Sequence, residues 1–357
     1  MRKLLLMLEI VVVLAGLTLG LVAWQQHRAL EQPLTLSEER LIEVPVGATP
    51  GGVLNRLEAD GVIDGAFWLR LYWRFNLKDQ PLHSGEYRLT PDLRVRDMLD
   101  LWRRGEVVQY SLTLVEGWTF RQVRAALARQ DKLELTLSEL SDAEIMATLG
   151  QPGENPEGRF FPDTYRYVRG MSDLDLLKQA HKRLQVVLDE EWEKRAEGLP
   201  YKDAYEALIM ASMIEKETGV PEERGEIAGV FVRRLATGMR LQTDPTVIFG
   251  LGERYQGRIT RAHLREPTPY NTYTIDGMPP TPIALVGREA IHAALHPVEG
   301  KTLYFVARGD GSHVFSETLE AHNRAVREYQ LKRRADYRSS PAPIPQNRAA
   351  LQLVFAH

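Results

Sequence analysis

The sequence predicts an α+β protein with three successive parts: an N-terminal membrane helix, a small α+β module and a mixed α+β domain. A long apolar stretch lies at the N-terminus, a strand, turn and helix pattern recurs over residues 39–130, and longer helical patterns precede a predicted hairpin within residues 155–332. The chain has 357 residues, of which 44% are hydrophobic and 26% charged. This composition is typical of a globular protein of two or three domains.

Residues 1–28 form the predicted membrane anchor and its flanks. The stretch Leu4–Trp24 is mostly apolar and, at about 1.5 Å per residue, long enough to cross a bilayer. Arg2 and Lys3 precede it, which predicts a cytoplasmic N-terminus and places the rest of the chain on the far side. Glu9 weakens the span without cancelling it. A cleaved signal peptide is the alternative, but the segment lacks a small-x-small cleavage site and is long for a signal, so we favour a retained anchor.

The module of residues 39–130 contains an internal repeat. Its three copies are IEVPVGATPGGVLNRL, YRLTPDLRVRDMLDLW and LTLVEGWTFRQVRAAL, each predicted as a strand, a turn and a helix. In each copy, apolar residues lie six and ten positions after a turn residue: Gly47, Val53 and Leu57; Asp92, Met98 and Trp102; Gly117, Val123 and Leu127. Units this small bury little surface alone, so we expect them to pack as one compact module.

The domain of residues 155–332 begins with long helices. Leu176–Glu197 has apolar residues three and four positions apart with charges between them, which is typical of an amphipathic helix. Ala207–Thr218 is an apolar helical run, and Gly219 and Pro221 predict its end.

The same domain is predicted to close with a β-hairpin and a helix. The runs LYFVA and HVFS flank a glycine-containing turn, and Glu317–Lys332 has a helical pattern. Residues 333–357, which include SSPAPIPQ, have too little apolar periodicity to form a core. We expect a flexible tail there and assign it no function.

Composition excludes several classes of function. The formal net charge of −3 and the lack of a long basic stripe disfavour nucleic acid as a partner. The absence of cysteine excludes thiol nucleophiles and thiolate metal sites. His292 and His296 share a helical face, but the adjacent glutamate of an HExxH motif is missing and Pro297 follows at once, so no metal site is predicted.

Glu217 is the candidate catalytic residue. At about 100° per residue, its side chain shares a helix face with Met210, Met213 and Ile214. An apolar surface disfavours the charged carboxylate, so the pKa of Glu217 should rise until the residue can serve as a general acid near neutral pH. Glu215 lies about 200° around the helix and cannot form a facing pair with it. A solvated or ion-paired structural glutamate is the alternative.

Candidate substrate contacts come from two polar, aromatic segments, GMRLQTDPTVIFGLG and EPTPYNTYTIDGMPPTPIA, which we expect to line one cleft with Glu217. Sugar recognition uses amides, hydroxyls and carboxylates for ring hydroxyls, and aromatic rings for C–H surfaces. The residues that supply these groups are Gln242, Thr243, Asp244, Tyr270, Asn271 and Tyr273. Structural alternatives exist: Asp244 before Pro245 suits a helix N-cap, Asn271 suits a turn, and the tyrosines suit packing.

The combination of ASMIEKET, RLQTDPTVIFGLG, TPYNTYTIDGMPPTPIA, AALHP and LYFVARGDGSHVFSET resembles the MltG, or YceG-like, family of endolytic murein transglycosylases. These ordered motifs cover the C-terminal half of the chain. The first repeat copy, with the helical stretch AFWLRLYWRF and a strand near residues 86–89, resembles a LysM-like glycan-binding module. A spacer or assembly domain without a ligand is the alternative for that module.

The resemblance implies that Glu217, the second glutamate of EKET, is catalytic. The implied substrate is the glycan strand of peptidoglycan, cut internally between N-acetylmuramic acid (MurNAc) and N-acetylglucosamine (GlcNAc) to leave a 1,6-anhydro-MurNAc end. No metal or organic cofactor is implied. The implied location is the inner membrane, with a periplasmic catalytic domain beside peptidoglycan synthases, where cleavage would terminate nascent strands.

Two alternatives stay open at this point. A hydrolytic muramidase would need a water-activating partner, with Asp244 or Glu215 as candidates, and would produce reducing ends. A non-catalytic scaffold would bind glycan strands through the LysM-like module and would use Glu217 only structurally.

Overall fold

The computed structural model describes residues 2–331, so the predicted tail of residues 333–357 lies outside the described residues. The chain divides into two compact units. Unit 1 comprises Met1–Leu112, Gln130–Thr136 and Arg166–Asp173, and unit 2 comprises Thr113–Arg129, Leu137–Tyr165 and the chain from Leu174 onward.

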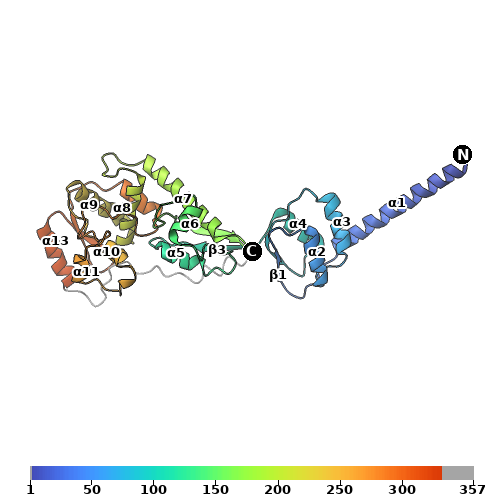
Figure 1. Cartoon of the computed structure of the whole chain (residues 1–357), viewed down its shortest axis with the longest axis horizontal. Coiled ribbons are helices and arrows are strands. Elements are labelled where there is room, and N and C mark those ends of the chain that lie inside the picture. The colour runs from blue at the N-terminus through green and yellow to red at the C-terminus, as the bar shows by residue number, and fades with distance from the viewer. Residues whose placement is uncertain (1, 332–357) are drawn as a thin grey trace. The chain divides into compact units, whose positions relative to one another are not determined.

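Unit 1 begins with helix α1, Arg2–Glu31, which projects from the unit in Figure 1. Its apolar part has a mean hydropathy of 2.6 and no buried residues, so α1 is long and apolar enough to cross a membrane. The last turn is different, because Ala29 and Leu30 are buried in the core of unit 1. The predicted N-terminal apolar helix is therefore confirmed.

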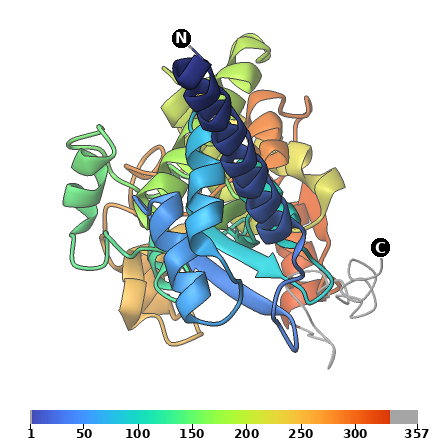
Figure 2. The same cartoon turned by 90° about the vertical axis from the view of Figure 1, so that its right-hand side faces the viewer.

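The rest of unit 1 is a small α+β fold built on a two-stranded antiparallel sheet, in which Ile42 is paired with Tyr87. Helices cover this sheet, and α3 lies beside α1 both in Figure 1 and in the end-on view of Figure 2. The elements are β1 (Arg40–Val44), α2 (Pro50–Ala59), α3 (Ala66–Asn76), β2 (Gly85–Leu89) and α4 (Val95–Arg104).

The predicted strand, turn and helix pattern occurs three times, as β1–α2, β2–α4 and β3 (Gln109–Thr113) followed by α5 (Phe120–Leu127). The apolar positions that the copies share are buried in all three: Val53, Leu57, Met98, Trp102, Val123 and Leu127. Trp102 is fully buried, and its ring contacts those of Trp73 and Tyr87. β3 pairs with β4 (Thr164–Val168), and the chain passes between the units within these strands.

Unit 2 is mainly helical and is organised around α8, Ala204–Glu217. Every residue from Ala207 to Ile214 is buried, as expected for a helix that is apolar all round and packed on several sides. Helices α9 and α12 pack directly against it. The other helices of the unit are α5, α6 (Asp142–Thr148), α7 (Asp173–Glu193), α9 (Arg224–Ala236), α10 (Asp244–Leu251), α11 (Arg261–Arg265), α12 (Arg288–Leu295) and α13 (Leu319–Ala325).

The predicted hairpin is confirmed as the antiparallel pair β5 (Tyr304–Ala307) and β6 (His313–Ser316). The predicted helix after it is formed in two parts, α13 followed by a π-helical turn over Val326–Leu331. The predicted amphipathic helix from residue 176 is also present, although α7 begins three residues earlier and ends at Glu193.

Candidate active site

Glu217 is the last residue of α8, at the point where the chain leaves the buried helix. Thr218 is extended, with φ −140° and ψ 137°, and its N–H donates to the carbonyl of Ile214 at 3.3 Å. The Thr218 hydroxyl accepts from the Val220 N–H at 2.9 Å. These bonds hold the helix end and present a partly buried Glu217 side chain beside the start of α10.

The Glu217 carboxyl is held by Thr243, whose hydroxyl donates to Oε1 of Glu217. Thr243 is itself buried within a network of threonines. Its N–H donates to the Thr272 hydroxyl at 3.0 Å, and its carbonyl accepts from the Thr246 hydroxyl at 2.8 Å. The hydroxyls of Thr246 and Thr272 lie 2.9 Å apart. Because each member of this network has a partner, the hydroxyl that meets Glu217 is kept in one orientation.

Burial raises the pKa of Glu217 to about 7. The hydrogen bond from Thr243 favours the charged form and opposes this rise, while the Asp244 carboxylate adds to it and Arg234 opposes it. Arg234 is buried in α9, where it donates to the carbonyls of Leu303 and Leu241. The pKa of Glu217 is therefore raised, in the direction expected from its helix face.

Glu215 occupies a different environment from Glu217. Its Oε2 accepts from the N–H of Gly287, which precedes α12, at 3.1 Å. Burial raises the pKa of Glu215 to about 7, and the nearby Glu116 carboxylate contributes to this rise. Glu215 and Glu217 thus meet different partners, as their 200° separation predicts.

Asp244 and Tyr273 form a polar pair next to the Glu217 site, with the Tyr273 hydroxyl donating to Oδ1 of Asp244 at 2.7 Å. Burial raises the pKa of Tyr273 above its ordinary value, so the phenol stays protonated and remains a donor. Asp244 was expected to cap α10, but the structure places Thr243 at the N-cap and Asp244 and Pro245 in the first turn. The Thr243 hydroxyl makes no cap bond because it is used by Glu217.

Gln242 directly precedes Thr243 in the chain, and its side chain is exposed. Among the residues that the structure describes, Gln242 is the only non-glycine with a positive φ, at 53°. A left-handed backbone costs an ordinary residue about 1–2 kcal/mol. The N–H of Gln242 donates to the carbonyl of Thr272 at 3.2 Å, which helps to hold this conformation. Such strained positions concentrate at ligand-binding sites.

Asn271 and Tyr270 have supporting positions in the following loop. The buried amide of Asn271 donates to the carbonyls of Glu266 at 2.7 Å and His263 at 3.1 Å, and its oxygen accepts from the Tyr273 N–H at 3.0 Å. The Tyr270 ring lies 4.8 Å from that of Phe249, and its hydroxyl is 2.9 Å from that of Thr281. These bonds shape the loop that carries Tyr273.

Four of the six predicted substrate contacts thus belong to the hydrogen-bonded residues around Glu217: Gln242, Thr243, Asp244 and Tyr273. The other two, Tyr270 and Asn271, brace the loop that carries Tyr273. Thr246, Thr272 and Arg234 were not predicted from the sequence. A threonine in a segment of this composition is unremarkable, and only the Arg234 charge within an apolar helical stripe could have suggested a buried role. Within residues 2–331, no cluster of three or more histidine or carboxylate side chains is placed to hold a metal.

Comparison with known proteins gives one consistent family. Residues 42–328 match the YceG-like family. An endolytic murein transglycosylase of Bacillus subtilis (strain 168) is 28% identical over 310 residues, which cover 81% of this chain and 84% of that protein. The Streptococcus pneumoniae D39 protein of the same name is 25% identical over 324 residues, or 81% of this chain and 58% of that protein.

A solved structure agrees with this match. The 2.6 Å crystal structure of a YceG-like protein from Listeria monocytogenes has a TM-score of 0.54 and 31% sequence identity. The similarity covers 81% of this chain and 99% of that one.

Proposed function

This chain belongs to the YceG-like family, and we propose that it is an endolytic peptidoglycan lytic transglycosylase in which Glu217 is the catalytic acid and base. The names of the Bacillus and Streptococcus relatives support the activity. The observation that carries the assignment of Glu217 is its position: a carboxyl at the end of a buried helix, held at one oxygen by Thr243, with a pKa raised to about 7 by burial.

The proposed reaction needs one carboxyl group. Protonated Glu217 donates its proton to the glycosidic oxygen between MurNAc and GlcNAc, and the bond from that oxygen to the anomeric carbon breaks. The N-acetyl group of the substrate stabilises the anomeric centre. The 6-hydroxyl of MurNAc then attacks this carbon and gives its proton to the Glu217 carboxylate. The products are a 1,6-anhydro-MurNAc end and a free GlcNAc end, and no water is consumed.

The arrangement of carboxylates favours this scheme over ordinary hydrolysis. Hydrolytic glycosidases use two carboxyl groups about 5 to 9.5 Å apart across the scissile bond. Glu215 accepts from the Gly287 N–H and not from the Thr243 hydroxyl that meets Glu217, and the Asp244 carboxylate accepts the Tyr273 hydroxyl. A group with pKa near 7 also suits a role that alternates between acid and base.

The surrounding residues divide into two proposed roles. Asp244 and Tyr273 would contact sugar hydroxyls and ring faces, because both interact electrostatically with the Glu217 carboxyl. Gln242 would join them through its exposed side chain. Thr243 would position the carboxyl, and Asn271 and Tyr270 would maintain the loop. No metal or organic cofactor takes part in the proposed steps.

We further propose that α1 anchors the protein in the inner membrane, with the N-terminus in the cytoplasm and the catalytic unit in the periplasm. Its length and hydropathy support a single span. Tethering to the surface where new strands emerge raises the effective concentration of enzyme at its substrate. The proposed biological role is to terminate the elongation of nascent strands next to peptidoglycan synthases.

The full-length chain in detergent, incubated with purified glycan strands, tests this function. Mass spectrometry should find new anhydro ends, which differ from reducing ends by one water. Glu217→Gln should abolish them while thermal unfolding still shows a cooperatively folded protein, whereas Glu215→Gln should keep the activity. Reducing ends would identify a hydrolase, and glycan binding without new ends would identify a scaffold.

A further inference from the structure

Helix α3 of unit 1 has an exposed face that combines cations with large apolar side chains. At about 100° per residue, Phe67, Arg70, Leu71, Arg74 and Phe75 fall within an arc of about 140°. Phe67 and Phe75 have 56% and 70% of their surface exposed, and both arginines are also exposed. The opposite side of the helix supplies Leu69 and Trp73 to the core of the unit. Arginines and exposed large apolar side chains occur together on helices that lie at a membrane surface.

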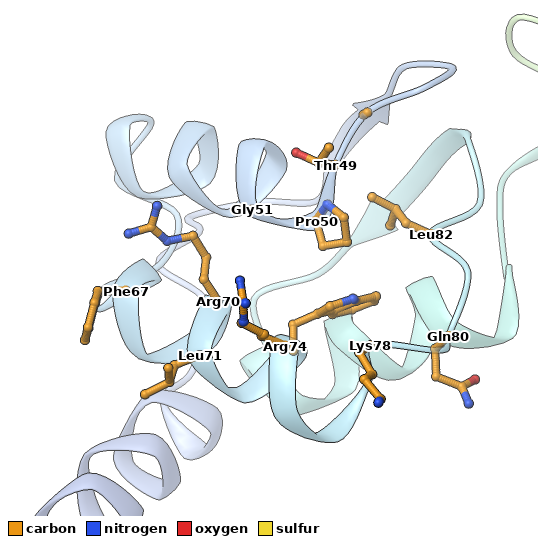
Figure 3. Close-up of a pocket in the computed structure, with 12 residues that line it drawn as sticks. Thr49, Pro50, Gly51, Phe67, Arg70, Leu71, Arg74, Lys78, Gln80 and Leu82 are labelled. Atoms are coloured by element: carbon orange, nitrogen blue, oxygen red, sulfur yellow. The ribbon is translucent and has the colours of Figure 1, made fainter.

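A pocket of about 640 Å³ opens along this face, and Figure 3 shows its lining. Arg70, Arg74 and Lys78 come from α3 and the loop after it, and the start of α2 forms another part of the wall. The stem of Arg70 lies 3.3 Å from the position that a Cβ on Gly51 would occupy. Among the described residues that line the pocket, none carries a negative charge.

The three cations of this pocket differ from most of the arginines of unit 1 outside it. Seven arginines of the unit form ion pairs with carboxylates: Arg40, Arg88, Arg94, Arg96, Arg103, Arg104 and Arg169. Within residues 2–331, Arg70, Arg74 and Lys78 have no ion pair. Arg70 and Arg74 are four residues apart on one helix, where like charges repel. An anionic ligand would relieve this repulsion.

The position of α3 beside α1 indicates where such a ligand would come from. The Cβ of Ala29 in α1 lies 3.8 Å from the position that a Cβ on Gly65, next to α3, would take. The Gln32 side chain donates to the Asp64 carbonyl at 2.7 Å and accepts from the Asp64 N–H at 3.2 Å. Ala29 is five residues after Trp24, or about 7.5 Å along the helix. Helix α3 is therefore held within a short distance of the point where the apolar stretch of α1 ends.

We propose that this face of α3, with its pocket, binds the phosphate headgroups of anionic phospholipids at the bilayer surface from which α1 emerges. The proposal rests on the proposed membrane anchor. The guanidinium groups and the Lys78 ammonium bind lipid phosphates, and the phenylalanines enter the interfacial layer. Binding of this kind adds a second attachment to α1 and sets the orientation of unit 1 on the membrane.

The chemistry of the pocket favours a phosphate over a neutral sugar. Sugar sites place donors and acceptors together around ring hydroxyls. Here the charged groups are all donors, and the side-chain oxygens of Thr49 and Gln80 are the acceptors that line the described pocket. The Thr49 oxygen already accepts the Gly52 N–H at 3.2 Å.

The experiment compares lipid preference of the full-length chain by native mass spectrometry from detergent, with dioleoyl phosphatidylglycerol and dioleoyl phosphatidylcholine in equal amounts. The test variant is Arg70→Gln/Arg74→Gln/Lys78→Gln. The matched control is Arg40→Gln/Arg88→Gln/Arg103→Gln, which removes the same charge from ion-paired positions of the same unit.

The wild-type chain and the control should prefer phosphatidylglycerol, and the preference should weaken as salt is raised. The test variant should lose about 100-fold of that preference, since each cation near an anionic surface contributes about fivefold. An unchanged preference in the test variant, or an equal loss in the control, would overturn the proposal. So would loss of binding to a MurNAc-containing oligosaccharide with the lipid preference intact, because that result would identify the pocket as a glycan site.

Two further measurements separate this proposal from the proposed catalytic role and from the proposed membrane anchor. The Glu217→Gln chain should keep the wild-type lipid preference, so failure of the catalytic proposal does not affect it. Resistance of the reconstituted chain to alkaline extraction from pure phosphatidylcholine vesicles tests α1 as an anchor without involving the cationic face. Thermal unfolding of the test variant should match that of the control, which excludes misfolding as the cause of a lost preference.

Discussion

The two units of this protein differ in whether carboxyl groups with a raised pKa are buried in them. In unit 1, several surface carboxylates are paired with arginines, as Glu39 is with Arg88 and Asp60 with Arg40. Unit 2 places three glutamates, Glu157, Glu215 and Glu217, where burial raises the pKa of each to about 7. Exposed ion pairs contribute about 0–1 kcal/mol each, whereas buried carboxyls are costly and concentrate at functional sites. The contrast locates the proposed chemistry in unit 2.

The three buried glutamates of unit 2 are not equivalent. Glu157 accepts from the Phe120 N–H at 3.1 Å and Glu215 from the Gly287 N–H at 3.1 Å, so both carboxyls meet the backbone next to a helix start. Glu217 is bonded to a side-chain hydroxyl instead. A backbone donor next to a helix start indicates a structural anchor, which distinguishes Glu157 and Glu215 from Glu217.

The largest expected effect comes from removing the proposed acid. Glu217→Gln should lower the rate of strand cleavage by about 10³-fold or more, because the amide cannot transfer the proton. Counting anhydro ends by mass spectrometry measures the loss. Glu157→Gln and Glu215→Gln serve as comparisons, since each should leave most of the activity. A similar loss in all three variants would contradict the distinction between anchors and acid.

The second prediction concerns the stability of the core of unit 1. Trp102→Ala removes a fully buried side chain and should destabilise unit 1 by about 3–5 kcal/mol. Denaturant unfolding of the full chain should show an early transition that the wild type lacks. A single transition at the wild-type midpoint would show that the repeat positions do not form a core.

The next effect concerns the hydroxyl that orients Glu217. Thr243→Val removes a hydrogen bond that favours the charged carboxylate, so the pKa of Glu217 should rise further and the base limb of the activity profile should move to higher pH. Cleavage should also slow by about tenfold, because the carboxyl is less well positioned. Thr243→Ser should restore both properties. A pH profile that does not move in Thr243→Val would assign the hydroxyl to substrate binding alone.

The smallest expected effect is on stability. Because the pKa of Glu217 in the folded state lies above its unfolded value, the folded state binds more protons between about pH 4.5 and 7. The contribution of Glu217 to the free energy of unfolding is fully present at low pH and falls as the pH rises through that window. The free energy of unfolding of Glu217→Gln should therefore rise by about 1–3 kcal/mol relative to that of the wild type when the pH is raised from 4.5 to 8. Chemical unfolding at the two pH values measures this difference.

The elements that could be predicted from the sequence are those that depend on local patterns. The helix that ends at Glu217 was identified from an apolar run followed by Gly219 and Pro221, and the repeat from spacing alone, because both depend on neighbours in the chain. The cap of α10 was misplaced by one residue. Asp244 is a good N-cap by type, but the start of the helix is set by Thr243, which is bonded to residues 26 and 29 positions away.

The same reason explains the missed residues of the site. The partners of Thr243 in α8 and in the loop near residue 272 lie 26 and 29 residues away, and a sequence contains no local signal for a contact over such separations. Asn271 shows the reverse case. Its residue type suits sugar recognition and a turn equally, and only its bonds to the carbonyls of Glu266 and His263 reveal that its amide shapes the loop.

The most direct test of this account is the titration of the Glu217 carboxyl itself. Infrared difference spectra between the full-length wild type and Glu217→Gln isolate the carboxyl band of this residue as the pH is changed. A band that titrates near pH 7 is the predicted result. A band that titrates near pH 4.5, as for a carboxyl in water, would contradict the proposal that burial prepares Glu217 to donate a proton.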